Sequence, residues 1–244
     1  MLAPVTEIFS SVQGEGLFLG CRQIFIRFGG CNLNCSYCDT IKGEQEYCRI
    51  ETVPGKRDFV LKKNPMRVAD VAEAAVSLKL SGHHSVSLTG GEPLLHSNFI
   101  RELIPSLKGT REGIYLETNG TLSDELSGII DYIDIVAMDV KLPSVAGLPE
   151  LWNKHRRFLE TAAGKIVFVK AVVREETPEE EIEMVCGLIE KVDKKIPLVI
   201  QPVSINGKIS SVSALRLADL QSYALRRLTD VRIIPQTHKI MGLL

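Results

Sequence analysis

The sequence predicts an α/β fold in the form of an incomplete, TIM-like (β/α)6-type barrel. From Arg67 onward, short apolar runs rich in β-branched residues alternate with longer segments whose apolar residues recur at helical spacing. Strands that alternate with helices form a parallel sheet with right-handed crossovers. The chain contains six or seven such units, fewer than the eight that close a barrel. We therefore expect an open barrel within a single domain spanning residues 1–244.

The residues before Arg67 predict two strands and a hairpin. A short strand is expected at 6–9, a glycine-containing turn at 13–16 and an apolar strand at 23–28. Residues 41–66 form an insertion in which two β-prone runs flank a Val-Pro-Gly-Lys turn at 53–56, and this pattern predicts a β-hairpin. The hairpin is interpreted either as a lid over a functional site or as a surface decoration.

The repeating units after Arg67 are bounded by changes in apolar periodicity and by turn residues. Strands are expected at residues 86–88, 113–117, 133–140, 166–173, 198–203 and 231–235. Helices are expected at residues 68–80, 98–107, 123–130, 150–162, 178–192 and 212–228. Ser123 has the side chain of a good N-cap for the third of these helices.

Polar residues gather at the predicted carboxyl ends of the strands. In βα architectures the functional residues lie beyond those ends. The clusters begin at Cys31, Thr89, Glu117, Asp139 and Gln201. One such cluster means little, because strand ends are commonly polar. Five of them predict a functional rim at one end of the barrel.

Composition favours a globular protein that acts on a small molecule. The 244 residues are 45% hydrophobic and carry 29 Lys and Arg against 30 Asp and Glu, for a net charge of −1. The balanced charge and the absence of a long basic run argue against a nucleic acid partner. No stretch approaches the ~18 consecutive apolar residues of a membrane span, and the first residues lack the basic region of a signal peptide. We expect a cytoplasmic protein without a membrane partner, and six cysteines fit a reducing compartment.

Three cysteines in one short segment predict a metal centre. Cys31, Cys35 and Cys38 have a C-x3-C-x2-C spacing, which lets three thiolates converge on an iron–sulfur cluster or on zinc. A ferredoxin or a structural zinc site would need a fourth ligand, and the neighbouring residues offer no obvious one. A [4Fe–4S] cluster on three cysteines leaves one iron open. An open iron can chelate the amino and carboxylate groups of S-adenosylmethionine, so the segment predicts radical chemistry.

A zinc staple is the alternative interpretation of this segment. Cys48, His83 or His84 would supply its fourth ligand. This alternative is less favoured, because zinc staples usually show two close ligand pairs and this segment shows a single triplet.

A second motif supports the radical interpretation. Residues 85–93 read Ser-Val-Ser-Leu-Thr-Gly-Gly-Glu-Pro, a short β-type run that ends in two glycines. Glycines let the backbone approach the methionyl end of the nucleotide closely. The carboxylate of Glu92 is positioned in the motif to accept a hydrogen bond from the methionyl ammonium group.

With these motifs the chain resembles the radical S-adenosylmethionine superfamily and, within it, the 7-carboxy-7-deazaguanine synthase family. The resemblance covers most of the chain, and its markers are residues 7–16, 24–28, 38–40, 89–93, 117–121 and 236–239. The cysteine triplet specifies only the superfamily. Gln-Gly-Glu-Gly at 13–16, Cys-Asp-Thr at 38–40 and Gln-Thr-His-Lys at 236–239 narrow it to the family.

The resemblance implies a set of residues that contact S-adenosylmethionine. These are Ser36, Tyr37, Asp39, Gly91, Glu92, Glu117, Asp139, Val140, Lys141, Gln201, Pro202, Val203 and Ser204. The chain reads Asp139-Val140-Lys141 where other members often carry Ser-Pro-Lys. A local ion pair between Asp139 and Lys141 is the alternative interpretation of these two residues.

The resemblance also implies a substrate site and a magnesium ligand. The implied substrate-binding residues are Val12, Gln13, Gly14, Glu15, Arg27, Thr89 and His238. A separate hypothesis is that the terminal carboxylate of Leu244 reaches the pocket as a further hydrogen-bond acceptor. A carboxylate such as Glu15 can accept two hydrogen bonds from the guanidine-like edge of a pterin. Arg27 lies inside an apolar run and needs an anionic partner, for which we expect the substrate carboxylate. Thr40 offers a hard oxygen of the kind that Mg²⁺ prefers.

The activity implied by the resemblance is that of a radical carbon–nitrogen lyase. It converts 6-carboxy-5,6,7,8-tetrahydropterin to 7-carboxy-7-deazaguanine with loss of ammonia, on a route to 7-deazapurine nucleosides such as queuosine or archaeosine. The implied cofactors are a [4Fe–4S] cluster, S-adenosylmethionine and Mg²⁺. An electron donor such as a flavodoxin or ferredoxin and a homodimeric state are also implied.

Two other functions remain open at this point. A glycyl-radical-enzyme activase can share the cysteine spacing but acts on a protein, and it would be expected to lack the 13–16 motif and His238. A non-catalytic iron–sulfur or zinc-binding module would share the triplet alone.

Overall fold

The computed structural model describes residues 1–38, 40, 43, 45–205, 208–209 and 212–243 of the chain. The strands are β1 (Leu2–Ala3), β2 (Val5–Val12), β3 (Arg22–Phe28), β4 (Tyr47–Glu51), β5 (Phe59–Lys63), β6 (Met66–Arg67), β7 (Ser85–Gly90), β8 (Ile114–Thr118), β9 (Ile135–Val140), β10 (Ile166–Val173), β11 (Leu198–Pro202), β12 (Ser204–Ile205), β13 (Lys208–Ile209) and β14 (Val231–Ile233). The α-helices are α1 (Val68–Ser77), α2 (Ser97–Leu103), α3 (Ser123–Ser127), α4 (Pro143–Ala146), α5 (Trp152–Ala162), α6 (Glu179–Asp193), α7 (Ala214–Ala224) and α8 (Thr237–Met241). Short 3-10 turns lie at Leu80–Gly82, Pro93–His96, Ile104–Ser106 and Ile130–Tyr132.

Ten of the described strands form one sheet in the order β14-β11-β10-β9-β8-β7-β3-β2-β4-β5. From β3 to β14 every neighbouring pair in this sheet is parallel. β2 runs antiparallel to β3. The predicted α/β fold with an open, partial barrel is therefore confirmed.

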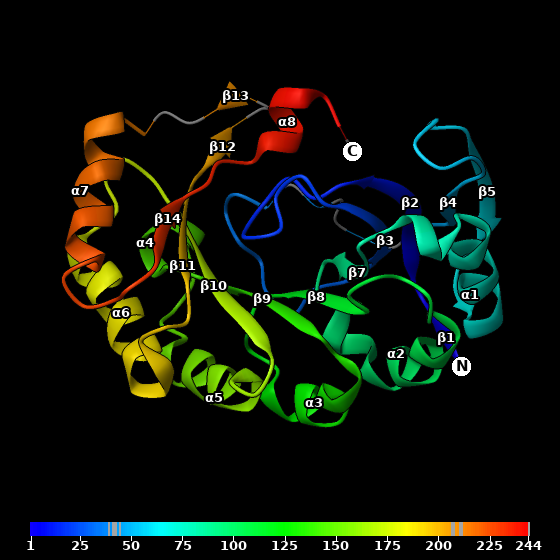
Figure 1. Cartoon of the computed structure of the whole chain (residues 1–244), viewed down its shortest axis with the longest axis horizontal. Helices are drawn as coiled ribbons and strands as arrows, with labels where there is room; N and C mark the ends of the chain where they lie inside the picture. The colour runs from blue at the N-terminus through cyan, green and yellow to red at the C-terminus, as the bar shows by residue number, and fades with distance from the viewer. Residues whose placement is uncertain (39, 41–42, 44, 206–207, 210–211, 244) are drawn as a thin grey trace.

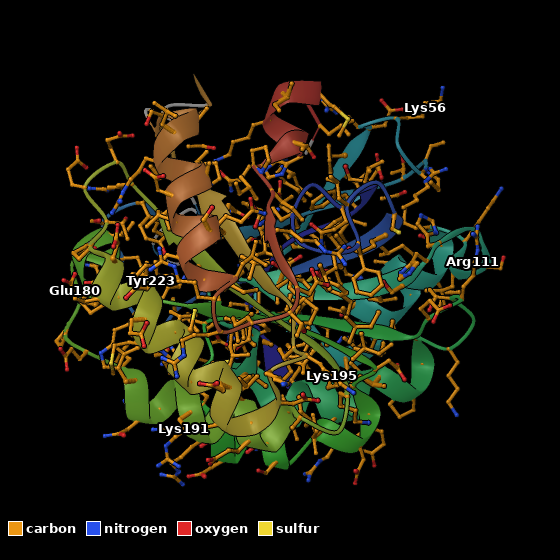
Figure 2. The ribbon with its side chains drawn as sticks, turned by 60° about the vertical axis from the view of Figure 1, so that its left-hand side comes forward. Lys56, Arg111, Glu180, Lys191, Lys195 and Tyr223 are labelled. Atoms are coloured by element: carbon orange, nitrogen blue, oxygen red, sulfur yellow. The ribbon has the colours of Figure 1, made fainter. Side chains whose placement is uncertain are left out.

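The sheet curves into a half-barrel that is open on one side (Figure 1). Helices α1, α2, α3, α5, α6 and α7 surround its convex side, and α8 extends across the open side. The larger apolar core lies between the sheet and the helices, where Ile26, Leu88, Phe158 and Ile182 are fully buried. Charged side chains such as Arg111 and Glu180 project from the periphery (Figure 2).

A second, smaller apolar cluster lines the concave side. Tyr115, Ala137, Phe168 and Val199 come from four neighbouring strands, and Phe18 packs against them. Successive side chains of a strand alternate between the two faces, so the residues two positions further on face the same side. Those residues are polar, namely Glu117, Asp139, Lys170 and Gln201. On the concave face, a layer of polar residues therefore lies next to this apolar cluster.

The observed elements differ from the predicted ones at several places. β2 is twice as long as expected, because its pairing with β3 continues through residues 10–12. Helix α4 was not predicted, since four residues carry too little periodicity. Ser123 is the first helical residue and not an N-cap, so that prediction is wrong. Ser213 instead caps α7, accepting a hydrogen bond from the backbone N–H of Arg216 at 3.1 Å.

The hairpin of β4 and β5 extends the edge of the main sheet through pairing between β4 and β2. Cys48 and Glu51 of β4 are fully buried. No residue of these two strands lines the cavity, whereas Gly43 of the same insertion does. The choice between a lid and a surface decoration therefore stays a prediction. Among the described residues, none of the helices has the length and apolar character that a membrane crossing requires.

Candidate active site

A cavity of about 780 Å³ opens on the concave face. Residues at the carboxyl ends of β3, β7, β8, β9, β10 and β11 line it, together with the turn after β2 and the C-terminal tail. Of the residues predicted from the sequence, the cavity is lined by Val12, Gln13, Gly14, Glu15, Arg27, Cys31, Cys35, Tyr37, Cys38, Thr40, Thr89, Gly91, Glu117, Asp139, Lys141, Gln201, Val203, Ser204 and His238. One cavity therefore brings most of the predicted residues together.

The three cysteines of the triplet share this cavity. Cys35 is buried, while Cys31 and Cys38 are exposed. The Cys31 sulfur lies 3.4 Å from the backbone nitrogen of Leu33 and 3.8 Å from Asn119 Nδ2. Burial raises the pKa of the Cys31 and Cys35 thiols, and the other thiols of the triplet raise it further. No group of three His, Cys, Asp or Glu side chains among the described residues could hold a single metal ion, so what the structure shows of the triplet is that its three cysteines line one cavity.

The loop that carries the triplet is anchored from outside the cavity. Ser36 donates from its backbone N–H to the carbonyl of Ala146 at 2.8 Å and from its hydroxyl to the carbonyl of Val145 at 2.7 Å. Ser36 does not line the cavity, so here it positions the loop on α4.

The residues that a zinc staple would recruit lie elsewhere. Cys48 is fully buried in the core between the sheet and the helices. His83 is also buried, against the expectation for a loop residue, and its Nε2 is 2.7 Å from the Ser10 hydroxyl. His84 contacts the Ser85 hydroxyl and the ring of Phe18. None of the three lines the cavity, so they do not complete a site with the triplet.

The turn after β7 packs against the cysteine loop. A Cβ atom on Gly91 would lie 1.8 Å from the carbonyl oxygen of Gly30, so only glycine fits there. Glu92 is fully buried and accepts hydrogen bonds from Leu94 N at 3.1 Å, Thr118 Oγ1 at 2.9 Å and Asn119 N at 2.8 Å. Burial raises the pKa of Glu92 to about 7 despite these donors. Glu92 does not line the cavity and ties the turns after β7 and β8 together.

The side of the cavity next to the triplet contains buried polar groups that lack partners. Lys141 Nζ lies 2.9 Å from Asp139 Oδ2 and 5.3 Å from the centre of the Tyr37 ring. The ion pair that was the alternative interpretation of Asp139 and Lys141 therefore exists. Within the described part of the chain, Asp139 Oδ1 and Gln201 Oε1 are buried without a hydrogen-bond partner.

The opposite side of the cavity is organised around Glu117 and Gln13. Glu117 accepts hydrogen bonds from Gln13 Nε2 at 2.7 Å and Thr89 Oγ1 at 2.8 Å. Gln13 Nε2 also donates to Gln23 Oε1 at 3.0 Å, and Gln13 Oε1 accepts from the backbone N–H of Glu15 at 3.0 Å. Gln13 thus ties the turn after β2 to two strands of the barrel, β3 and β8.

Glu15 lies in the same turn and contacts both strand β10 and the C-terminal tail. Its carboxylate forms an ion pair with Lys170 and accepts from Gln236 Nε2 at 2.6 Å. Burial alone raises the pKa of Glu15, but Lys170, Gln236 and His238 more than offset burial and hold it at about 2. Glu15 is therefore ionised at neutral pH.

Arg27 has a protein partner that the sequence analysis did not identify. Its Nε lies 3.2 Å from Glu7 Oε2, and Glu7 also contacts Arg49 at 2.8 Å. The guanidinium carbon lies 5.6 Å from the centre of the Phe9 ring. Arg27 is 29% exposed and lines the cavity, so its charge is paired and still reaches the open volume.

The C-terminal tail completes the cavity wall. Thr237 donates to the carbonyl of Gly14 from its backbone nitrogen at 2.9 Å and from its hydroxyl at 3.2 Å. His238 packs so closely that a Cβ atom on Gly14 would lie 2.2 Å from its Nδ1. Arg57 donates to the carbonyl of Gly242, which links the tail to the turn of the hairpin.

Some predictions have no support in this geometry, and some lining residues were not predicted. Val140 and Pro202 are buried but do not line the cavity. Asp39 and Leu244 lie outside the described residues. Lys170 and Asn119 line the cavity and were missed. A lysine within the apolar run 166–173 gives the same signal as Arg27 in its strand, so Lys170 could have been found.

Comparison with known proteins decides the family. Residues 25–185 match the Radical SAM superfamily. The chain is 46% identical to the 7-carboxy-7-deazaguanine synthase of Geobacter sulfurreducens, over 98% of this chain and 97% of that relative. The chain belongs to the 7-carboxy-7-deazaguanine synthase family. The family member from Methanocaldococcus jannaschii is 33% identical, over 98% of this chain and the whole of that relative. The crystal structure of QueE from Escherichia coli has a TM-score of 0.60 at 21% identity, over 98% and 95% of the two chains, which supports the fold.

Membership of the radical SAM superfamily implies a [4Fe–4S] cluster and S-adenosylmethionine. The described residues fit both groups. Three thiols share one end of the cavity, as a cluster on three cysteines requires. The unpartnered Asp139 Oδ1 and Gln201 Oε1 supply polar atoms for a ligand in the same cavity.

Proposed function

We propose that the chain converts 6-carboxy-5,6,7,8-tetrahydropterin to 7-carboxy-7-deazaguanine with loss of ammonia. The observation that carries this proposal is that one cavity of about 780 Å³ is lined by the cysteine triplet and by Gln13, Glu15, Arg27 and His238. Identity of 46% to a family member over nearly the whole chain supports the same reaction. A cavity of this size suits a nucleotide cofactor with a small heterocycle, and this favours a small substrate over the protein partner of an activase.

Cys31, Cys35 and Cys38 would hold the [4Fe–4S] cluster. When bound, the cluster and S-adenosylmethionine would together supply the one-electron radical chemistry needed for abstraction of a hydrogen atom from the substrate. Asp139 and Lys141 would contact the cofactor, since they lie near Cys35. Gln201 lines the same cavity and would contact the cofactor through its unpartnered Oε1. Gly91 has no side chain, so the cofactor could approach its backbone closely in the cavity.

The remaining residues would bind and orient the pterin. The contact between Arg27 and Glu7 uses only Nε, and a guanidinium has five N–H donors, so Arg27 can also grip the substrate carboxylate. Glu15 would accept from the guanidine-like edge of the pterin, and Gln13, Thr89 and His238 would complete the contacts.

We also propose Mg²⁺ as a cofactor, held by Thr40 together with the substrate and water. The Thr40 side chain lines the cavity and lies 3.4 Å from the carbonyl of Gly90. A hard hydroxyl oxygen with few other protein ligands suits Mg²⁺. A flavodoxin or ferredoxin as reductant and a homodimeric state are further parts of the proposal that rest on the family.

The deciding experiment is an anaerobic incubation of cluster-reconstituted protein with S-adenosylmethionine, a reductant, Mg²⁺ and 6-carboxytetrahydropterin. We expect mass spectrometry to detect 7-carboxy-7-deazaguanine with the natural chain and not with Cys35→Ala. Absence of the product from protein with an intact cluster would overturn the substrate assignment. A separate experiment tests the requirement for Mg²⁺. Product formation by the natural chain without Mg²⁺ is compared with product formation by Thr40→Val.

A further inference from the structure

Lys170 is a buried lysine that the proposed function does not use. It lies in β10, whose other inward-facing residues near it are Phe168 and Val172. Only 14% of its side chain is exposed. A buried lysine is costly unless its charge is paired, so its surroundings should explain its presence.

Lys170 lies in a row of charged side chains whose signs alternate. Its ammonium group pairs with the carboxylate of Glu15 and lies 3.6 Å from Asp139 Oδ2. Asp139 is the registered neighbour of Lys170 in the parallel pair of β9 and β10, so both side chains emerge on the concave face. Asp139 in turn contacts Lys141 at 2.9 Å. We call Glu15, Lys170, Asp139 and Lys141 the charge row.

The charge row leaves Glu15 with two specific acceptor sites. A carboxylate has about four lone-pair positions on its two oxygens. Lys170 takes one position on Oε2, and Gln236 takes one on Oε1. Counting these two donors from the described part of the chain, one position then remains on each oxygen. Two parallel acceptor positions on one carboxylate match two adjacent N–H donors, as in the guanidine-like edge of a pterin.

Glu15 needs a positive neighbour to remain ionised in this setting. Several groups face it, namely Lys170 from β10, Gln236 before α8, His238 in α8 and the phenol of Tyr115 in β8. Burial alone raises its pKa, and Lys170 is the largest opposing influence. Without Lys170 the carboxyl group would take up a proton at a higher pH and would lose one acceptor position.

We propose that Lys170 is a positioning residue of the substrate site, which holds the Glu15 carboxylate ionised and oriented for two N–H donors of the substrate. Asp139 holds Lys170 in place at the other end. This inference rests on the proposed function, because the ring that carries those donors is the proposed substrate.

The test compares Lys170→Met with Lys170→Arg in the cluster-loaded protein. Binding of 6-carboxytetrahydropterin is measured by calorimetry with S-adenosylmethionine and no reductant, from pH 6 to pH 8. We expect Lys170→Met to lose about tenfold in affinity at pH 8, the loss typical of one charge-assisted hydrogen bond. The loss should grow toward pH 6, because the pKa of Glu15 is raised in this variant. Lys170→Arg should restore most of the affinity, and Lys195→Met, at an exposed site, should bind like the natural chain.

A double variant keeps the test decisive if Lys170→Met folds poorly. Lys170→Met in a Glu15→Gln background leaves no unpaired Glu15 charge, and we expect it to bind like Glu15→Gln alone at every pH. A further tenfold loss there would show that Lys170 does not act through Glu15. An unchanged affinity and pH profile in Lys170→Met would also overturn the inference. If the natural chain itself does not bind this pterin, the proposed function fails instead.

Discussion

At the scale of single residues, the site depends on close contacts made by Glu92 and Gly91, which substitution of either residue would disrupt. Glu92 joins two strand-end turns through three donors, although burial makes its ionised form costly. Gly91 lets one of these turns touch the backbone of the cysteine loop. Neither residue needs to touch a ligand for the triplet to be held in place.

Gly91→Ala should therefore disrupt cluster loading. The added Cβ would lie 1.8 Å from Gly30 O, so the cysteine loop or the turn must move, at a cost of about 1–3 kcal/mol in unfolding free energy. We expect a lower iron content after reconstitution and a lower melting temperature. Gly164→Ala is the matched control, because its Cβ would meet nothing within 4 Å. Equal iron content in the two variants would contradict this role.

Substitution by alanine should distinguish cysteines that bind the cluster from cysteines that pack in the core. Cys35 lines the cavity, whereas Cys48 is fully buried in the core. We expect Cys35→Ala to lose the iron–sulfur absorbance with little change in stability of the apoprotein. Cys48→Ala should keep the absorbance and lose about 1–2 kcal/mol of stability to the cavity it creates. Loss of iron in Cys48→Ala would show that the core assignment of Cys48 is wrong.

At the scale of elements, the sequence predicted what apolar periodicity controls. The strand at 166–173 was predicted with its observed bounds, and helix α6 differs by one residue at each end. Buried parallel strands and amphipathic helices have strong periodic patterns. The length of β2 was not predictable, because its added residues 10–12 pair with residues 22–24 of β3, and how far that antiparallel pairing continues is visible only in the fold.

The residues of the candidate site also divide into those that local sequence motifs predict and those that only the fold brings together. Residues in local motifs, such as Cys31, Gly91 and Gln13, were found because their chemistry is visible in a few neighbouring letters. Pairings between distant segments were not found. Glu7 with Arg27 and Glu15 with Lys170 join residues that only the fold brings together.

Helix α8 provides a test at this scale. A Cβ on Gly14 would lie 2.2 Å from His238 Nδ1, so Gly14→Ala should displace the tail from the turn after β2. We expect the KM for the pterin to rise about tenfold, equivalent to about 1.4 kcal/mol of binding free energy. Proteolysis of the tail should become faster, while binding of S-adenosylmethionine stays unchanged. Gly164→Ala serves as the control, and an unchanged KM in Gly14→Ala would rule out this role of the tail.

At the scale of the whole molecule, stability and chemistry use opposite faces of one sheet. The larger core fills the convex side, between the strands and the helices. The cavity occupies the concave side above a smaller apolar cluster. Polar groups that cost folding energy, such as the unpartnered Gln201 Oε1, can be kept there because the convex core does not depend on them.

This division predicts that the protein stays folded without its cluster. In zinc fingers the metal supplies the folding energy, and removal of the metal unfolds the chain. Here only Cys35 of the triplet is buried, and none of the three sulfur ligands belongs to the convex core. Anaerobic chelation of iron should leave the far-ultraviolet circular dichroism spectrum unchanged and lower the melting temperature by less than about 8 °C, equivalent to about 2 kcal/mol for a domain of this size. Hydrogen exchange should accelerate around residues 31–38 and remain slow in β8 to β11. Collapse of the dichroism signal on chelation would mean that the cluster supports the fold, and Cys35→Ala should then collapse as well.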